Sequence, residues 1–140
     1  MHMMVGISKE YGVEAVVLKN SSFKAVDFCD FVCKIADKNN NFVVFCDNAS
    51  IHKCILAKRA IELRGVRIIY NLVRTPDLNC IEKLFRAVKL VYRRRRLQSI
   101  IDGRIKNPKV LVREVFQDLD PTIPKKLCEH GLNQWHEDCR

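Results

Sequence analysis

Apolar residues recur along this chain with two different periods. Short apolar runs predict strands at residues 3–8, 13–18, 42–46 and 66–70. A turn at residues 9–12 separates the first two runs, so we expect them to form a hairpin. The third run is apolar at every position, which is typical of a strand buried on both faces.

Between the later strands the apolar spacing changes to three and four residues, which is typical of helices. Ser21 or Ser22 can cap the first of these helices. Its apolar face comprises Phe28, Phe31, Val32 and Ile35. A second helix is expected from Ser50 to Arg64, and Gly65 follows where helices commonly end in a left-handed residue.

The longest helix is expected at residues 81–98. Its apolar stripe comprises Ile81, Leu84, Phe85, Val88 and Tyr92. Asn107-Pro108 predicts the cap and first residue of the next helix, and Asp120-Pro121 repeats this pattern for a short last helix that ends near Gly131. The order β-β-α-β-α-β-α with two closing helices predicts an α/β domain, with helices flanking a mixed sheet.

The charge of the chain favours a polyanionic partner. Its 25 Lys and Arg exceed its 16 Asp and Glu, which gives a net charge of +9 and favours nucleic acid over a membrane surface. No apolar run approaches the roughly 20 residues of a membrane span, and no signal peptide is visible. The seven cysteines lack the spacing of a disulfide framework, so we expect reduced thiols in an intracellular protein.

Two acids stand where ligands commonly gather. Asp47 ends an apolar strand, and Glu82 begins the longest helix. Their carboxylate oxygens suit a hard divalent cation. Each acid also has an ordinary structural role, because Asp-Asn pairs form turns and acids stabilise helix N-termini. A metal site therefore depends on the fold bringing both acids together.

Further polar residues surround these two acids in the sequence. His52 can orient a phosphate or a metal-bound water, although a solvent-facing histidine is commoner. Asn48 can support Asp47 through a hydrogen bond, and Asn79 can cap the longest helix. A basic stripe follows Glu82 at helical spacing, which suits a nucleic-acid backbone as well as an ordinary solvated face. We predict DNA binding by Arg86, Lys89, Arg93, Arg94, Arg95 and Arg96.

Cysteine and histidine near the C-terminus offer another interpretation, a small interaction module held by zinc. Its four ligands would be Cys128, His130, His136 and Cys139. Their spacing is irregular for structural zinc. Cys29 and Cys33, one helical turn apart, are more simply explained as small hydrophobes on a packed helix.

Two motifs resemble the catalytic domain of the mariner-like DDE transposases, within the ribonuclease-H-like superfamily. The segment Asp47-Asn48-Ala49-Ser50-Ile51-His52-Lys53 is similar to the D-N-A-x-x-H-K-like motif around the family's second acid. Thr75-Pro76-Asp77-Leu78-Asn79-Cys80-Ile81-Glu82 is similar to S-P-D-L-N-P-I-E, which carries the last acid. Phe85, Lys89 and the closing Cys128-Glu129-His130-Gly131 also stand where the family has comparable residues.

The resemblance implies a two-metal site for cleavage and strand transfer of DNA. Asp47 and Glu82 would be the second and third acids of a triad that holds two Mg²⁺ or Mn²⁺ ions. The implied partner is DNA, either transposon ends or target DNA. Further expectations are a homodimer and a nuclear location in a eukaryotic host or a cytoplasmic one otherwise.

This sequence departs from the family at the first acid, which lies on a strand before the hairpin. No residue here occupies that place, since Asp27, Asp30 and Asp37 belong to a helix, and Glu10 and Glu14 to the hairpin. Cys80 also replaces the usual proline.

We therefore expect a ribonuclease-H-like α/β sheet without its first strand. Residues 1–140 would form one partial catalytic domain, with the sheet and motifs at about 1–98 and closing helices at about 99–140. Such a domain would not cleave DNA alone. The alternative from another functional class is a non-catalytic nucleic-acid-binding remnant of a transposase.

Overall fold

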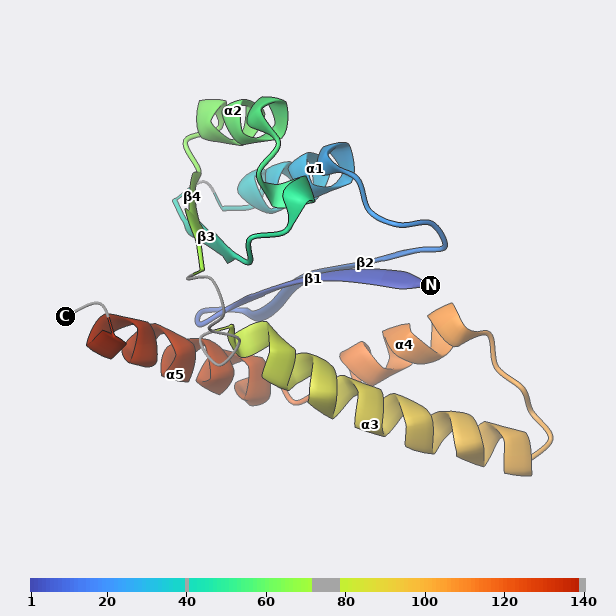
Figure 1. The fold of residues 1–140 in the computed structure, drawn as a ribbon. Coiled ribbons are helices and arrows are strands. Elements are labelled where there is room, and N and C mark those ends of the chain that lie inside the picture. The colour runs from blue at the N-terminus through green and yellow to red at the C-terminus, as the bar shows by residue number, and fades with distance from the viewer. Residues whose placement is uncertain (40, 72–78, 139–140) are drawn as a thin grey trace. The chain divides into compact units, whose positions relative to one another are not determined.

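The computed structural model describes residues 1–39, 41–71 and 79–138, with side chains up to residue 134. Residues 75–78 of the second motif lie outside the described residues. The elements (Figure 1) are β1 His2–Ser8, β2 Gly12–Lys19, α1 Ala25–Ala36, β3 Val43–Cys46, the 3₁₀ turn η1 Ser50–His52, α2 Ile55–Leu63, β4 Arg67–Tyr70, α3 Cys80–Ile101, α4 Pro108–Gln117 and α5 Thr122–Asp138. The predicted α/β class is confirmed.

Two compact units make up the chain. The first comprises Met1–Gly6 and Glu14–Asn79, and the second comprises Ile7–Val13 and Cys80–Arg140. The boundary passes through the β1–β2 hairpin, whose base belongs to the first unit and whose tip belongs to the second.

The four described strands form two separate sheets rather than one mixed sheet. β1 pairs with β2 as the predicted hairpin, and β3 pairs with β4 in parallel. The parallel register places Cys46 beside Tyr70 at the carboxyl ends of β3 and β4. No strand among the described residues joins the hairpin to this parallel pair.

The core of the first unit forms around the predicted apolar face of α1. Phe28, Phe31 and Val32 are buried there with Ile61 of α2 and Val66. Side chains from both sheets pack against this cluster, among them Met4, Ala15, Val44, Cys46 and Ile68. The prediction that β3 is buried on both faces is wrong, because alternate residues face this core and Phe45 is 45% exposed.

The N-termini of the first two helices differ from the prediction. Neither serine caps α1, which begins after Lys24, and the Asp27 carboxylate accepts a hydrogen bond from the Lys24 amide at 2.7 Å. Ser50 begins the turn η1, so α2 starts later than predicted, at Ile55. At its other end α2 stops before Gly65, whose φ of +77° confirms the left-handed position.

The second unit is helical apart from the hairpin tip. α3 packs against α4 and α5 and buries Leu84 and Val88. The predicted cap of α4 is confirmed, since the Asn107 side chain accepts a hydrogen bond from the Lys109 amide at 2.9 Å. α5 does not end near Gly131 as predicted but continues to Asp138, with Gly131 buried. No helix in the described part is long and apolar enough to cross a membrane.

Candidate active site and nucleic-acid interface

Asp47 lies at the carboxyl end of the parallel strand pair. It follows Cys46, the last residue of β3, and Asn71 follows Tyr70, the residue paired with Cys46. The Asn71 amide donates a hydrogen bond to the Cys46 carbonyl at 2.8 Å, so the ladder extends to this edge. Ligands of parallel sheets bind at such edges, and the predicted place of Asp47 is confirmed.

The two oxygens of the Asp47 carboxylate have different hydrogen-bonding partners. Oδ1 accepts a hydrogen bond from the Ala49 amide at 3.0 Å, which is the turn that an Asp-Asn pair favours, and it lies 2.8 Å from Nδ1 of His52. Oδ2 bonds to none of the residues that the structure describes. The Asp47 side chain is 56% exposed, so this oxygen can reach a cation from solvent.

His52 is the ordered partner of Asp47 rather than a solvent-facing side chain. It is only 15% exposed, and its ring lies against Phe28 with the ring centroids 4.4 Å apart. The His52 carbonyl accepts a hydrogen bond from the Tyr70 hydroxyl at 2.8 Å, and Nδ1 lies 3.2 Å from the Asp47 carbonyl. Contacts from α1 and β4 therefore fix the imidazole beside the carboxylate.

Asn48 connects the two strand ends. Its side-chain amide donates a hydrogen bond to the Asn71 carbonyl, rather than to the Asp47 carboxylate as predicted. It therefore supports Asp47 indirectly, by holding the loop after β3 against the loop after β4. Burial, followed by the charge of Asp47, raises the pKa of the neighbouring Cys46 thiol to about 12, so this thiol stays neutral.

Two residues of this environment, Phe28 and Tyr70, were not foreseen as parts of the site. The sequence places Phe28 on the apolar face of α1 and Tyr70 at the end of a strand. A parallel pairing of β3 with β4 would have placed Tyr70 beside Cys46, and so near Asp47. That pairing is the signal by which Tyr70 could have been found.

Glu82 lies in the first turn of α3, where its side chain is exposed. Asn79 directly precedes this helix in the N-cap position and is half-buried. Asp47 belongs to the first unit and Glu82 to the second. The approach of these two acids to one another remains a prediction.

Cys80 anchors the start of α3 within the second unit. A hydrogen bond with the buried Cys128 of α5 is the main cause that lowers the pKa of the Cys80 thiol, while desolvation opposes it. Neither cysteine forms a disulfide bond with another described residue. This contact holds the first turn of α3, which carries Glu82, against α5.

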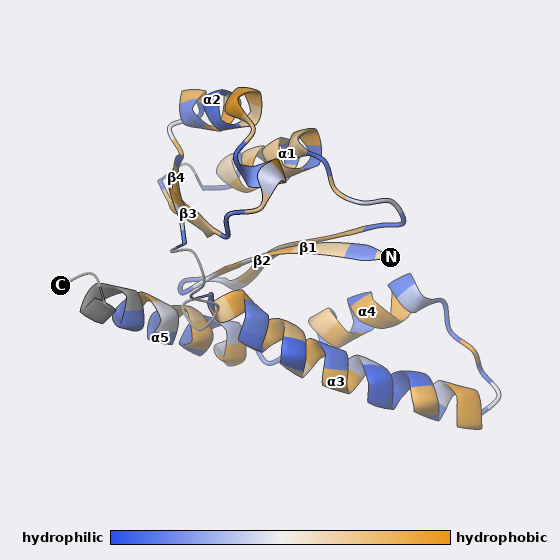
Figure 2. Ribbon diagram, in the orientation of Figure 1, coloured by the Kyte–Doolittle hydropathy of each residue, from blue (hydrophilic) through white to orange (hydrophobic). Residues whose placement is uncertain are grey.

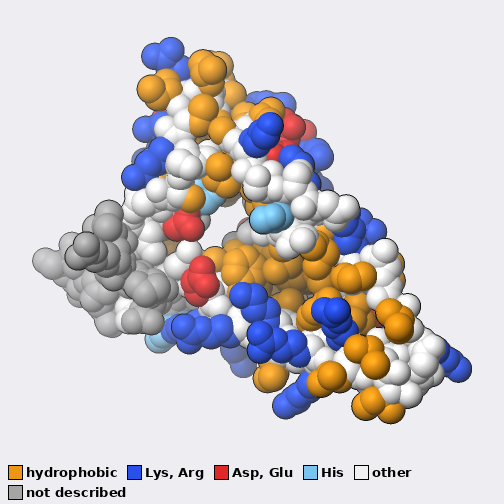
Figure 3. All heavy atoms as spheres, turned by 45° about the vertical axis from the view of Figure 1, so that its right-hand side comes forward, with side chains coloured by type: hydrophobic (Ala, Val, Ile, Leu, Met, Phe, Trp, Pro, Cys, Tyr) orange, Lys and Arg blue, Asp and Glu red, His pale blue; other side chains and the backbone are white. Residues whose placement is uncertain are grey.

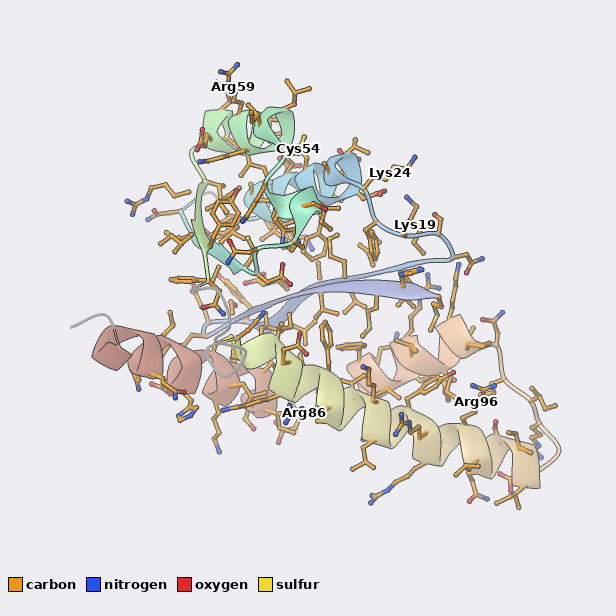
Figure 4. The ribbon with its side chains drawn as sticks, in the orientation of Figure 1. Lys19, Lys24, Cys54, Arg59, Arg86 and Arg96 are labelled. Carbon is orange, nitrogen blue, oxygen red and sulfur yellow. The ribbon has the colours of Figure 1, made fainter. Side chains whose placement is uncertain are left out.

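The predicted DNA-binding residues of α3 form an exposed surface, with one exception. Arg86, Lys89, Arg93, Arg94 and Arg96 are exposed, whereas Arg95 is half-buried and pairs with Asp118 at 2.8 Å. Arg86 and Arg96, which Figure 4 labels, show the length of this surface along the helix. In Figure 3 Lys and Arg side chains lie beside hydrophobic ones on the surface of the second unit.

The proposed zinc ligands are only partly visible. Cys128 is buried and His130 is exposed, whereas the His136 side chain and Cys139 lie outside the described residues. Within the described part of the chain, no group of three His, Cys, Asp or Glu side chains is arranged to hold a metal ion. The zinc interpretation therefore gains no support from Cys128 and His130.

Comparison with protein families identifies the chain's family. The family model described as DDE superfamily endonuclease matches residues 1–102, which include β1 to β4 and the whole of α3. Among curated proteins, no sequence matches this chain.

Proposed function

Since this chain belongs to the DDE superfamily of endonucleases, we propose that it is a transposase-derived domain of the mariner-like type that acts on DNA. The observation that carries the proposal is Asp47, which ends β3 with one carboxylate oxygen free of described partners and the other beside His52. The family match covers this strand and also Glu82. In a eukaryotic host such a domain would act in the nucleus.

Nucleases of this superfamily generally use divalent metal ions. The exposed Asp47 carboxylate fits Mg²⁺ or Mn²⁺, because these ions prefer oxygen ligands and keep several waters of their own. We assign Asp47 and Glu82 as two ligands of this site. Bound there, the ions would supply Lewis-acid stabilisation of the phosphodiester oxygens and activation of the attacking hydroxyl.

The residues of this chain have distinct tasks in the proposed mechanism. Asp47 would hold a cation through the oxygen that bonds to no described residue, and His52 keeps the carboxylate in its orientation from the opposite oxygen. Asn48 fixes the loop that carries Asp47 by bonding to the Asn71 carbonyl. Two acids near the ends of α1 are already engaged, since Asp27 pairs with Lys19 and the C-cap residue Asp37 with Arg64. Neither therefore offers a free third carboxylate.

Cleavage tests this proposal directly. Any Mg²⁺- or Mn²⁺-dependent nicking of supercoiled plasmid, by this chain or by a longer one that also carries the first acid, should fall at least a hundredfold in Asp47→Asn and in Glu82→Gln. Asp30→Asn is the matched control, because Asp30 is an exposed acid of the same unit as Asp47. Equal nicking by Asp47→Asn and Asp30→Asn would exclude Asp47 as a ligand.

The exposed cations of α3 favour a second candidate, a nucleic-acid-binding domain without cleavage activity. Each phosphate contact contributes about −0.9 to the slope of log K against log salt concentration. Replacing Arg86, Lys89, Arg93 and Arg96 by alanine should therefore reduce the steepness of that slope by up to about 4 for duplex DNA. Arg59→Ala on α2 is the control for an exposed arginine outside this surface.

The two candidates differ in their response to metal. Salt-sensitive binding that is the same with EDTA and with Mg²⁺, and that comes without nicking, supports the binding domain. Binding or nicking that requires the metal and Asp47 supports the endonuclease.

A further inference from the structure

A second exposed face of α3 carries aliphatic residues instead of a continuous row of cations. Leu90 is 52% exposed, Leu97 is 62% exposed and Ile101 is 77% exposed. Figure 2 shows hydrophobic positions interspersed with hydrophilic ones along this helix. Side chains of this size and exposure leave on the order of 300 Å² of apolar surface in water, which is the size of patch that monomers commonly use for binding.

The spacing on this face follows a heptad repeat. Ala87, Leu90, Arg94, Leu97 and Ile101 alternate in steps of three and four, as do the a and d positions of a coiled coil. All five are exposed. We call this set the α3 seam. It covers 15 residues, or roughly 21 Å of helix at 1.5 Å per residue.

The seam is distinct from the row of four cations whose replacement tests DNA binding, and it shares with the predicted DNA-binding residues only Arg94. Leu84, Val88 and Ser99 mark the buried side of α3. At 100° per residue, the cations Arg86, Lys89, Arg93 and Arg96 lie on one exposed flank, and the seam lies next to them on the other. Arg94 therefore lies on the same face of α3 as Leu90 and Leu97, and on a different face from the other cations.

Charge decides what this seam can bind. Arg94 occupies its central a position and makes no ion pair with the described residues. The helix α3 contains seven Lys and Arg residues and a single Glu. A second copy, aligned in register in either direction, would bring two unpaired guanidinium groups together at the centre of the contact, which is unfavourable. A partner helix with an acidic residue opposite Arg94 would instead form an ion pair, in which the carboxylate also fits the planar guanidinium group.

We propose that the α3 seam is a docking surface for an acidic amphipathic helix of another protein. That helix places aliphatic side chains against Leu90, Leu97 and Ile101 and a carboxylate against Arg94. The apolar contacts provide the affinity, and the single charge at an a position selects the partner and its register. The assignment does not depend on the metal site or on cleavage.

Synthetic 21-residue helices test the seam with the full 140-residue chain. The first peptide has Leu at its a and d positions except for one central Glu, with further Glu at the flanks. A second peptide has Lys for every Glu, and a third has Ser for every Leu. Binding is measured by fluorescence anisotropy at physiological salt. Of the three peptides, we expect only the first to bind.

Variants of the chain identify the face. Leu97→Ser should weaken binding of the first peptide at least tenfold, and Arg94→Glu should do the same while creating affinity for the Lys peptide. Leu63→Ser, at a leucine of α2 that is 89% exposed, and Arg59→Glu are matched controls that should leave binding unchanged. All four positions are exposed, so circular dichroism should remain that of the parent chain.

Four outcomes overturn the proposal. Binding of the Ser peptide as tight as that of the Leu peptide shows that charge alone acts. Insensitivity to Leu97→Ser places the contact elsewhere. Sedimentation showing a dimer that Leu97→Ser dissociates makes a second copy the occupant. A loss of duplex-DNA affinity in Leu97→Ser assigns the face to DNA.

Discussion

Asp47 illustrates how one side chain serves structure and chemistry together. Its Oδ1 accepts a hydrogen bond from the Ala49 amide and lies beside His52, while its Oδ2 bonds to no residue in the described ranges. The structural role predicted for an Asp-Asn pair is therefore present, and it does not exclude a metal-binding role, because the two roles use different oxygens. The turn orients the carboxylate at the edge of the strands.

The sequence identifies Asp47 more readily than it identifies what holds it. An acid after an apolar strand is visible in the pattern, whereas the burial of His52 depends on Phe28 and Tyr70, which are 24 positions before it and 18 after it. Local periodicity carries no information on such contacts. For the same reason, motif spacing alone does not establish the distance between Asp47 and Glu82.

Asp27 gives a prediction at the residue scale that involves pH. Hydrogen bonds from Lys19 and then from the Lys24 amide lower the pKa of its carboxyl group. A lowered folded pKa means that the ionised carboxylate stabilises the fold above about pH 4 and that this contribution is lost as the pH falls through the folded value. Urea unfolding should therefore show Asp27→Asn less stable than the parent at pH 7, with the difference shrinking towards pH 2.

Asp30→Asn on the same helix is the control for this experiment. Asp30 is exposed and has no hydrogen bond or ion pair with the described residues, so its replacement should change stability by less than about 0.5 kcal/mol at either pH. A difference for Asp27→Asn that grows on acidification would contradict the assigned direction.

At the scale of elements, the cap of α4 provides the clearest test. The Asn107 side chain accepts from the Lys109 amide, and Pro108 needs no such partner because it lacks an amide hydrogen. Asn107→Ala should lower the free energy of unfolding by about 1 kcal/mol in chemical denaturation. Gln117→Ala, at an exposed position in the last turn of α4, should change it by less than about 0.5 kcal/mol.

The sequence predicts helices and strands well where neighbouring residues determine them, and poorly where tertiary contacts set their limits. The hairpin, the apolar face of α1 and the α4 cap depend on neighbouring residues, and all three are confirmed. The start of α1 depends instead on Asp27, which bonds to Lys19 across the loop that contains both serines. Gly131 lies buried inside α5, where close packing offsets its low helix propensity.

At the scale of the whole molecule, the two units should open separately. Ile61 is fully buried in the first unit and Leu84 in the second. Replacing either by alanine should cost about 2–5 kcal/mol, because each change leaves a cavity in a packed core. Hydrogen exchange should accelerate mainly in α1, α2, β3 and β4 for Ile61→Ala, and mainly in α3 and α4 for Leu84→Ala.

Conservative variants distinguish core packing from a general loss of folding. Ile61→Val should accelerate exchange in the same elements as Ile61→Ala, with a cost of about 0.5–1.5 kcal/mol. Equal acceleration throughout the chain in both alanine variants would mean that the two units unfold as one.

The hairpin tip also limits where recombination can divide the gene without disrupting a compact unit. Gly12 at its end has a φ of +81°, and a methyl group added there would lie 3.0 Å from the Pro121 carbonyl oxygen, while Lys9 pairs with Glu129 at 3.0 Å. The second unit is thus assembled from two stretches that are almost seventy codons apart. A recombination event after codon 79 would separate α3 to α5 from residues 7–13, so the second unit could not be inherited as an intact module.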